Sequence, residues 1–119
     1  MKKTLVLGAT DNPARYAYRA VHQLQQHGHE VVPVGIRKGH VAGLEIRNDR
    51  PAADAVDTVT LYVGPQNQPA WYDYILDLNP KRIIFNPGTE NPELEELAQQ
   101  RGIRTEEACT LVMLSVGQY

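Results

Sequence analysis

Small residues follow the first apolar segment of the chain, where they could bind a phosphate group. Residues 4–7 are apolar or β-branched, and Gly8-Ala9-Thr10 comes next. Glycine adopts backbone angles that other residues avoid, and small side chains let a phosphate approach the backbone closely. Free N–H groups at the start of the following helix would then face the anion. The spacing therefore predicts a phosphate-binding turn here.

This turn departs from the dinucleotide fingerprint G-x-G-x-x-G, because Thr10 and Pro13 replace its second and third glycines. NAD-binding domains usually place Asp or Glu at the end of their second strand to hold the ribose hydroxyls. This chain has Val34 there, and Arg37 and Lys38 follow. The missing acidic residue disfavours NAD, whereas the two cations suit a phosphate near the ribose and leave NADP open. The alternative is that they form an idle, solvated loop.

The remaining reactive side chains form no recognisable catalytic set. The four histidines lack carboxylate or cysteine partners at metal-ligand spacing, so we predict no metal site. We expect all four at the solvated surface, namely His22, His27, His29 and His40. Cys109 opens the last predicted helix, but Glu106 and Glu107 oppose a lowered thiol pKa there. We expect Cys109 to be a buried structural residue. No catalytic residue is predicted, and the sequence disfavours catalysis by this chain.

Short β-branched runs alternate with longer helix-like segments along the chain. We predict strands over residues 4–7, 30–34, 58–63, 82–85 and 103–105, and helices over residues 13–27, 69–78, 92–101 and 108–115. Asn12 and Asn91 are each followed by proline and are expected to cap helices, which Gly28 and Gly102 would end. Residues 37–57 have no clear assignment.

This alternation favours an α/β fold: a Rossmann-like, doubly wound, mainly parallel five-stranded sheet with helices on both faces. Such sheets bind ligands at the carboxyl ends of their strands, near the point where the strand order reverses. The crevice would then be lined by four segments, namely residues 8–16, 34–38, 62–65 and 86–89.

Composition limits the possible classes of protein. The 119 residues predict one domain over residues 1–119. A net charge of −2 disfavours a nucleic-acid binder, which would carry a basic excess. No apolar run approaches the roughly 18 residues of a membrane span, and the N-terminal stretch is too short for a signal peptide. A single cysteine excludes an internal disulfide and favours a reducing compartment. We therefore predict a cytoplasmic protein, and no feature indicates a protein partner.

Several segments together resemble a known family. Residues 5–35 read LVLGATDNPARYAYRAVHQLQQHGHEVVPVG, and VDTVTLYVGP and IIFNPGTENPELEELAQQRGI follow in the same order. These segments resemble the small stand-alone CoA-binding proteins, which are similar to the CoA-binding domain of the succinyl-CoA synthetase α subunit. The sequence stops where the second domain of those synthetases would begin, so their phosphohistidine chemistry is not expected.

The resemblance implies a role for each segment of the crevice. The Gly8-Ala9-Thr10 turn would meet the pyrophosphate, Arg15 and Lys38 would meet CoA phosphates, residues 62–65 would flank the adenine, and residues 86–88 would border the pantetheine. Tyr16 and Tyr62 are the tyrosines expected to contact the ligand. The predicted ligand-binding residues are Gly8, Ala9, Thr10, Asn12, Arg15, Tyr16, Val34, Gly35, Arg37, Lys38, Tyr62, Val63, Gly64, Asn86, Pro87 and Gly88.

The hypothesis from the sequence is thus non-covalent binding of CoA or an acyl-CoA, without catalysis by this chain. One alternative is an enzyme dependent on NAD(P) or another adenine nucleotide, with an unrecognised catalytic group. Another is an interaction module whose crevice stays empty.

Overall fold

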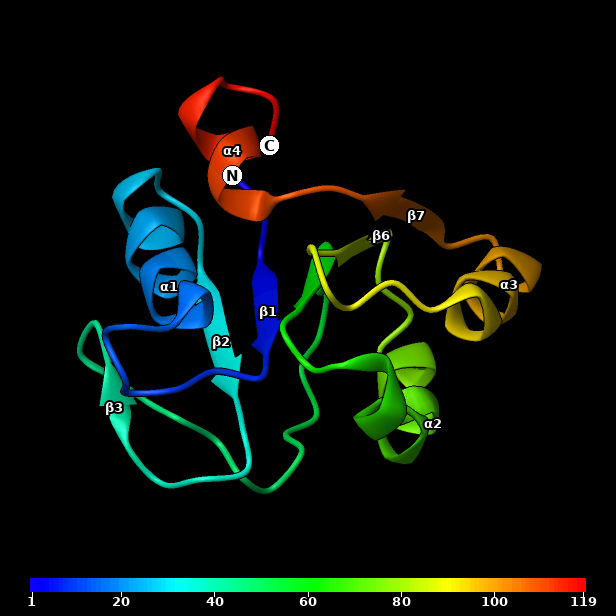
Figure 1. Ribbon diagram of the computed structural model, residues 1–119, viewed down its shortest axis with the longest axis horizontal. Helices are drawn as coiled ribbons and strands as arrows, with labels where there is room; N and C mark the ends of the chain where they lie inside the picture. The colour runs from blue at the N-terminus through cyan, green and yellow to red at the C-terminus, as the bar shows by residue number, and fades with distance from the viewer.

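The computed structural model describes residues 1–119 and contains one five-stranded parallel sheet. Its strand order is β2-β1-β5-β6-β7, as Figure 1 shows in part. The strands are β1 (Thr4–Leu7), β2 (Val31–Val34), β5 (Thr58–Leu61), β6 (Arg82–Phe85) and β7 (Arg104–Glu107). Every residue of β1, β5 and β6 is buried, because helices cover both faces. The predicted α/β, doubly wound, Rossmann-like fold is confirmed.

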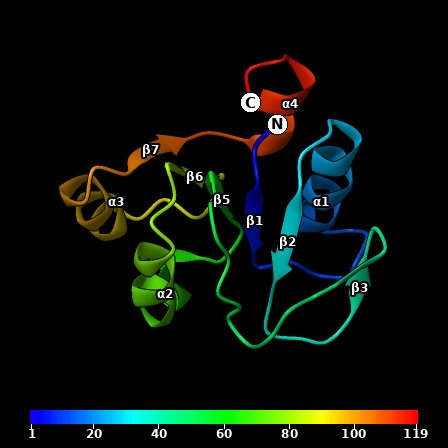
Figure 2. The ribbon, with the colours of Figure 1, turned by 180° about the vertical axis from the view of Figure 1, so that it is seen from behind.

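Four α-helices form the two outer layers, which Figures 1 and 2 show on opposite sides of the sheet. They are α1 (Tyr16–Gln26), α2 (Tyr72–Asp77), α3 (Pro92–Gln100) and α4 (Thr110–Ser115). One apolar cluster joins α2 and α3 to the sheet through residues such as Leu5, Ile75 and Leu94. A second cluster joins α1 and α4 to the other face, around Val6 and Leu114. No helix is long and apolar enough to cross a membrane.

The strand order reverses at β1, which is hydrogen-bonded to β2 on one side and to β5 on the other. The chain leaves β1 over one face through α1, whereas the later connections through α2 and α3 use the other face. Loops that diverge from neighbouring strand ends leave a crevice between them. The carboxyl ends of β1 and β5 are therefore the place to look for a ligand.

Several element boundaries differ from the predicted ones. Helix α1 begins at Tyr16 rather than at residue 13, because the Asn12 Oδ1 atom accepts a hydrogen bond from the Ala14 N–H (3.0 Å) and closes a local turn. The predicted helix over residues 69–78 divides into a 3-10 turn (η2, Pro69–Trp71) and α2. The predicted cap at Asn91 is confirmed, since its Oδ1 accepts from two N–H groups of α3.

The remaining boundaries shift by a few residues. Strand β2 begins at residue 31 and β5 ends at residue 61, so each is shorter than predicted. Strand β7 covers residues 104–107, and α4 begins at residue 110. A further 3-10 turn, η1 (Pro65–Asn67), precedes η2.

The unassigned segment contains a small antiparallel hairpin, β3 (His40–Val41) and β4 (Leu44–Glu45). Its turn residues Ala42 and Gly43 have φ values of 53° and 79°, as a two-residue hairpin turn with matching twist requires. Val41 and Ile46 are buried against α1. The hairpin thus supports the loop that follows β2.

Candidate ligand-binding site

A cleft of about 800 Å³ lies at the carboxyl ends of the strands. The loops after β1, β2, β5 and β6 form its walls, and the arrows of β1 and β2 point toward this end of the molecule in Figure 1. All predicted ligand-binding residues line it except Val34 and Asn86. The structure thus brings together the four segments that the sequence placed around one crevice.

The turn after β1 packs tightly against the neighbouring strands. Gly8 has φ +98°, and a Cβ atom there would lie 3.0 Å from the carbonyl carbon of Tyr62. The N–H groups of Gly8 and Ala9 both donate to the Val34 carbonyl, at 2.9 and 3.0 Å. These two amides are therefore engaged by the fold. Amide donors for an anion come instead from the first turn of α1, whose N-cap Arg15 provides no side-chain cap.

The loop after β2 approaches the β1 turn closely at Gly35. A Cβ atom at Gly35 would lie 2.5 Å from the Ala9 carbonyl oxygen, so only glycine fits without a backbone shift. The Asn48 Nδ2 group donates to the carbonyls of Gly35 (2.8 Å) and Arg37 (3.0 Å). This side chain, which follows the hairpin, holds the loop at the cleft.

Three cationic side chains from two loops surround the cleft. Arg15 belongs to the loop after β1, and Arg37 and Lys38 belong to the loop after β2. All three are exposed, and none belongs to any of the four ion pairs in the structure. Asp11 is the only acidic residue among the lining side chains. The cleft therefore has a cationic surplus, which favours an anionic ligand.

The two predicted residues outside the lining have structural roles. Val34 is fully buried and contributes only its carbonyl to the β1 turn. Asn86 is 2% exposed. Its Nδ2 group donates to the Thr60 Oγ1 atom (2.6 Å) and the Leu61 carbonyl (2.8 Å), and its Oδ1 accepts from the Thr110 N–H. Neither residue is among those that line the cleft, so the structure does not bring Val34 and Asn86 together with the other predicted ligand contacts.

Two tyrosines line the cleft in different ways. Tyr16 is 68% exposed, at the start of α1. The Tyr62 ring is partly buried, and its hydroxyl is buried without a hydrogen-bond partner. Burial raises the pKa of Tyr62, so its hydroxyl stays protonated at neutral pH.

Seven lining residues were not among the predicted ligand contacts, namely Asp11, Ala17, Ile36, Ile46, Asn67, Trp71 and Thr89. Three of them lie within the predicted crevice segments, Ala17 and Asn67 lie within two residues of a segment, and only Ile46 and Trp71 lie farther along the chain. The sequence carried no signal for Trp71 beyond its place in the predicted helix over residues 69–78. Trp71 is 8% exposed, and the Arg50 guanidinium covers its ring at 4.1 Å.

The histidines and the cysteine lie outside the cleft lining. His29, expected at the solvated surface, is partly buried: its Nδ1 atom accepts from the Lys2 N–H (2.9 Å), and its ring lies 4.9 Å from that of Tyr119. Burial, more than the neighbouring positive charges, lowers its pKa. His22 is also partly buried, and Cys109 at the N-cap of α4 is partly rather than fully buried. No three His, Cys, Asp or Glu side chains gather where they could hold a metal ion.

Comparison with protein families gives a match over nearly the whole chain. The family described as "CoA binding domain" matches residues 2–115. The chain belongs to the CoA binding domain family. Its cleft lies entirely within the matched residues, while none of the curated proteins compared with it matches.

Solved structures share the fold of this CoA binding domain. A crystal structure described as an uncharacterized protein is 60% identical, with a TM-score of 0.98, over 100% of this chain and 98% of its own. A hypothetical protein from Pyrococcus horikoshii OT3 is 25% identical, with a TM-score of 0.87, over 97% of this chain and 82% of its own. A Thermus thermophilus structure, 23% identical with a TM-score of 0.84 over 99% and 91%, is similar in fold.

Proposed function

We propose that this protein binds CoA or an acyl-CoA non-covalently in the cleft. The observation that carries the proposal is the group formed by Arg15, Arg37 and Lys38, which surround the cleft without ion-pair partners. CoA has a pyrophosphate and a 3′-phosphate, and phosphates bind most strongly to charged donors. The chain's membership of the CoA binding domain family and the position of the cleft where the strand order reverses support the same ligand.

The proposed pose follows the four walls of the cleft. The pyrophosphate would lie beside the Gly8-Ala9-Thr10 turn, near Arg15 and the first amides of α1. The 3′-phosphate would lie at Lys38, in the loop that Asn48 holds. Residues 62–64 would flank the adenine, and residues 87–88 would border the pantetheine.

The proposal is for binding without catalysis. The titratable residues that line the cleft are Asp11, Arg15, Tyr16, Arg37, Lys38 and Tyr62. The hydroxyl of Tyr62 is buried behind the cleft wall and keeps its proton. No pair among these side chains has the nucleophile–base hydrogen bond that covalent catalysis requires.

Calorimetric titration with CoA, NAD, NADP and AMP tests the proposed ligand. We expect CoA to bind most tightly, because it alone offers both a pyrophosphate and a 3′-phosphate. NADP is the demanding competitor, since its 2′-phosphate could also reach Arg37 and Lys38. Tighter binding of NAD or NADP than of CoA would refute the proposal in favour of a nucleotide-dependent enzyme. Absence of binding to all four ligands would also refute it.

A further inference from the structure

Helix α4 has few apolar contacts with the sheet. Only Thr110 and Leu114 are buried among its six residues. Val112 and the following Val116 are 57% and 60% exposed. Helix α1 on the same face buries four apolar side chains. Besides its packing against α1, two polar attachments hold α4 in place.

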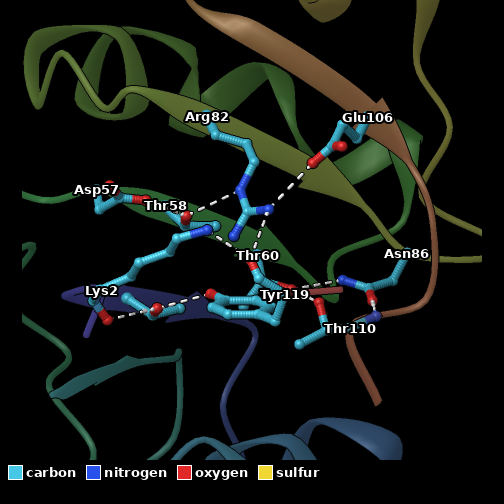
Figure 3. A network of polar contacts seen from close by, with 10 residues as sticks. Lys2, Asp57, Thr58, Thr60, Arg82, Asn86, Glu106, Thr110 and Tyr119 are labelled. Carbon is cyan, nitrogen blue, oxygen red and sulfur yellow. Dashed lines mark hydrogen bonds and ion pairs between the residues drawn. The ribbon is translucent and has the colours of Figure 1, made fainter. Parts of the chain in front are cut away.

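The first attachment is a buried hydrogen-bond network at the start of α4. The Thr110 N–H donates to the Asn86 Oδ1 (2.9 Å), and the Thr110 hydroxyl lies 2.8 Å from that of Thr60. Asn86 also binds Thr60, so the three residues form a closed network, seen in Figure 3. Asn86 directly precedes Pro87 and Gly88, which line the cleft. This attachment thus connects α4 to a cleft wall.

The second attachment is at Tyr119, beyond the end of α4. Its hydroxyl lies 2.7 Å from that of Thr4, and the Arg82 guanidinium lies 4.5 Å from the centre of its ring. Its main-chain oxygen accepts hydrogen bonds from the Lys2 Nζ and from the Arg82 Nη1 (3.4 Å). The ring of His29 lies 4.9 Å from the Tyr119 ring, measured between their centres. Residues at the amino-terminal ends of the strands therefore hold the segment after α4 (Figure 3).

Arg82 makes this second attachment less stable than its number of contacts suggests. The side chain is 2% exposed. Its Nε donates to the Thr58 Oγ1 (3.0 Å) and its Nη1 pairs with Glu106 (3.2 Å), but its Nη2 is buried without a partner. Burying a charged donor without full compensation is unfavourable. Hydration of Nη2 on release of Tyr119 would offset part of the lost contacts.

Tyr62 follows the carboxyl end of β5, two residues after Thr60 of the first attachment. Its ring lines the cleft, while it also packs against the apolar cluster that contains Leu114 of α4. Its hydroxyl is buried without a hydrogen-bond partner. Movement of α4 would therefore expose that hydroxyl and free the ring that forms part of the cleft wall.

We propose that residues 110–119, here called the strap, open locally from the sheet and that closure of the strap favours ligand in the cleft. The coupling rests on the proposed function, because its ligand is CoA. Closure fixes Asn86 before the loop that lines the cleft, and it fixes Tyr62 in the wall. A ligand that binds this arrangement better than the open one must in turn stabilise the closed strap.

Amide hydrogen exchange without ligand tests strap opening. We expect amides of the strap to exchange through local opening, faster than the core amides of α3, which report global unfolding. Tyr119→Ala removes the second attachment and should speed strap exchange by about tenfold while α3 changes little. Tyr119→Phe keeps the ring over Arg82 and loses only the hydroxyl, so it should give a smaller increase. Val112→Ala, an exposed change within α4, is the matched control and should not speed strap exchange, because alanine favours the helix.

The ligand arm of the same experiment tests coupling. CoA should slow strap exchange in the unchanged protein, and Tyr119→Ala should weaken CoA binding by about fivefold, at the lower end of typical coupling. Strap amides that exchange only as slowly as the α3 core would overturn the proposal. Equal CoA affinity of the protein and Tyr119→Ala would overturn the coupling while the binding function stands. If CoA does not bind at all, the binding function fails and the coupling with it, and ligand-free exchange alone decides whether the strap opens.

Discussion

Lys38 distinguishes a phosphate site from an idle surface loop. It is exposed, it lines the cleft, and it has no ion-pair partner. A charge-assisted contact with phosphate contributes about 1.5–3 kcal/mol. Lys38→Ala should therefore weaken CoA binding by roughly tenfold to a hundredfold, measured by calorimetry. Dephospho-CoA, which lacks the 3′-phosphate, should lose much less affinity.

Lys81 provides the matched control for Lys38. It is also exposed, but it precedes β6 at the opposite end of the sheet. Lys81→Ala should leave CoA affinity unchanged. Equal losses for CoA and dephospho-CoA on Lys38→Ala would move the contact to the pyrophosphate. No loss with either ligand would leave Lys38 in solvent and make Arg15 or Arg37 the better candidate.

His29 gives the protein a pH-dependent stability. Its Nδ1 accepts a hydrogen bond from the Lys2 N–H, so the folded state needs the neutral ring. Burial lowers its pKa below the ordinary 6.5. Just below pH 6.5 the unfolded chain therefore binds more protons than the folded chain, and stability falls as pH decreases. We expect a lower urea midpoint at about pH 5.5 than at about pH 7.5.

His29→Asn should reduce this pH dependence, because an amide oxygen accepts the same hydrogen bond without titrating in this range. Carboxylates also take up protons as the pH falls, so the informative quantity is the change in urea midpoint between the two pH values, compared between the protein and the variant. His27→Asn changes an exposed histidine and should preserve the full pH dependence. If His29→Asn and His27→Asn behave alike, His29 does not contribute.

At the scale of elements, Gly35 is where β2 passes closest to the turn after β1. Gly35→Ala places a Cβ atom 2.5 Å from the Ala9 carbonyl oxygen. Backbone must then shift, which should destabilise the protein by about 1–3 kcal/mol and weaken CoA binding, measured by urea unfolding and calorimetry.

Gly39→Ala is the control in the same loop. The new Cβ atom there would meet the flexible side chain of Asp11, at 2.7 Å from its Oδ2. This side chain can rotate away, so the stability loss should be distinctly smaller. Similar losses of stability for Gly35→Ala and Gly39→Ala would show that the close approach at Gly35 does not restrict this position to glycine.

Elements with local signals could be predicted from the sequence, and those decided by packing could not. Apolar β-branched runs located β1 and β6 to the residue, and Asn91 with Pro92 located the start of α3. Helix α1 begins later than predicted because Asn12 stabilises a separate turn. The small hairpin has strands of two residues each, too short for a periodic pattern.

The candidate site follows the same division. Crevice segments could be derived from the strand ends, because the fold places those ends together. Trp71 lines the cleft because of where the fold places η2. Val34 and Asn86 do not line it, because both are buried in the interior. The alternation of side chains between the two faces of a strand does not show which of them a neighbouring loop will bury.

At the scale of the whole molecule, a ligand that binds only the folded chain must stabilise it. At a CoA concentration about a hundred times Kd, the gain is about 2.7 kcal/mol. For a chain of 119 residues, this corresponds to a rise in Tm of roughly 10 °C. Scanning calorimetry should show this rise with CoA and a smaller one with AMP. An unchanged Tm at saturating CoA would contradict specific binding to the folded state.

The order of the strands also bears on self-association. Strands β2 and β7 lie at the two edges of the sheet. In β2, Pro33 has no N–H group, and its carbonyl already accepts from the Arg47 N–H (2.9 Å). In β7, three of four residues are charged. Proline and charge both discourage pairing with a strand of another molecule. The sheet therefore offers no favourable edge for polymerisation, and we expect concentrated protein to resist forming fibrils.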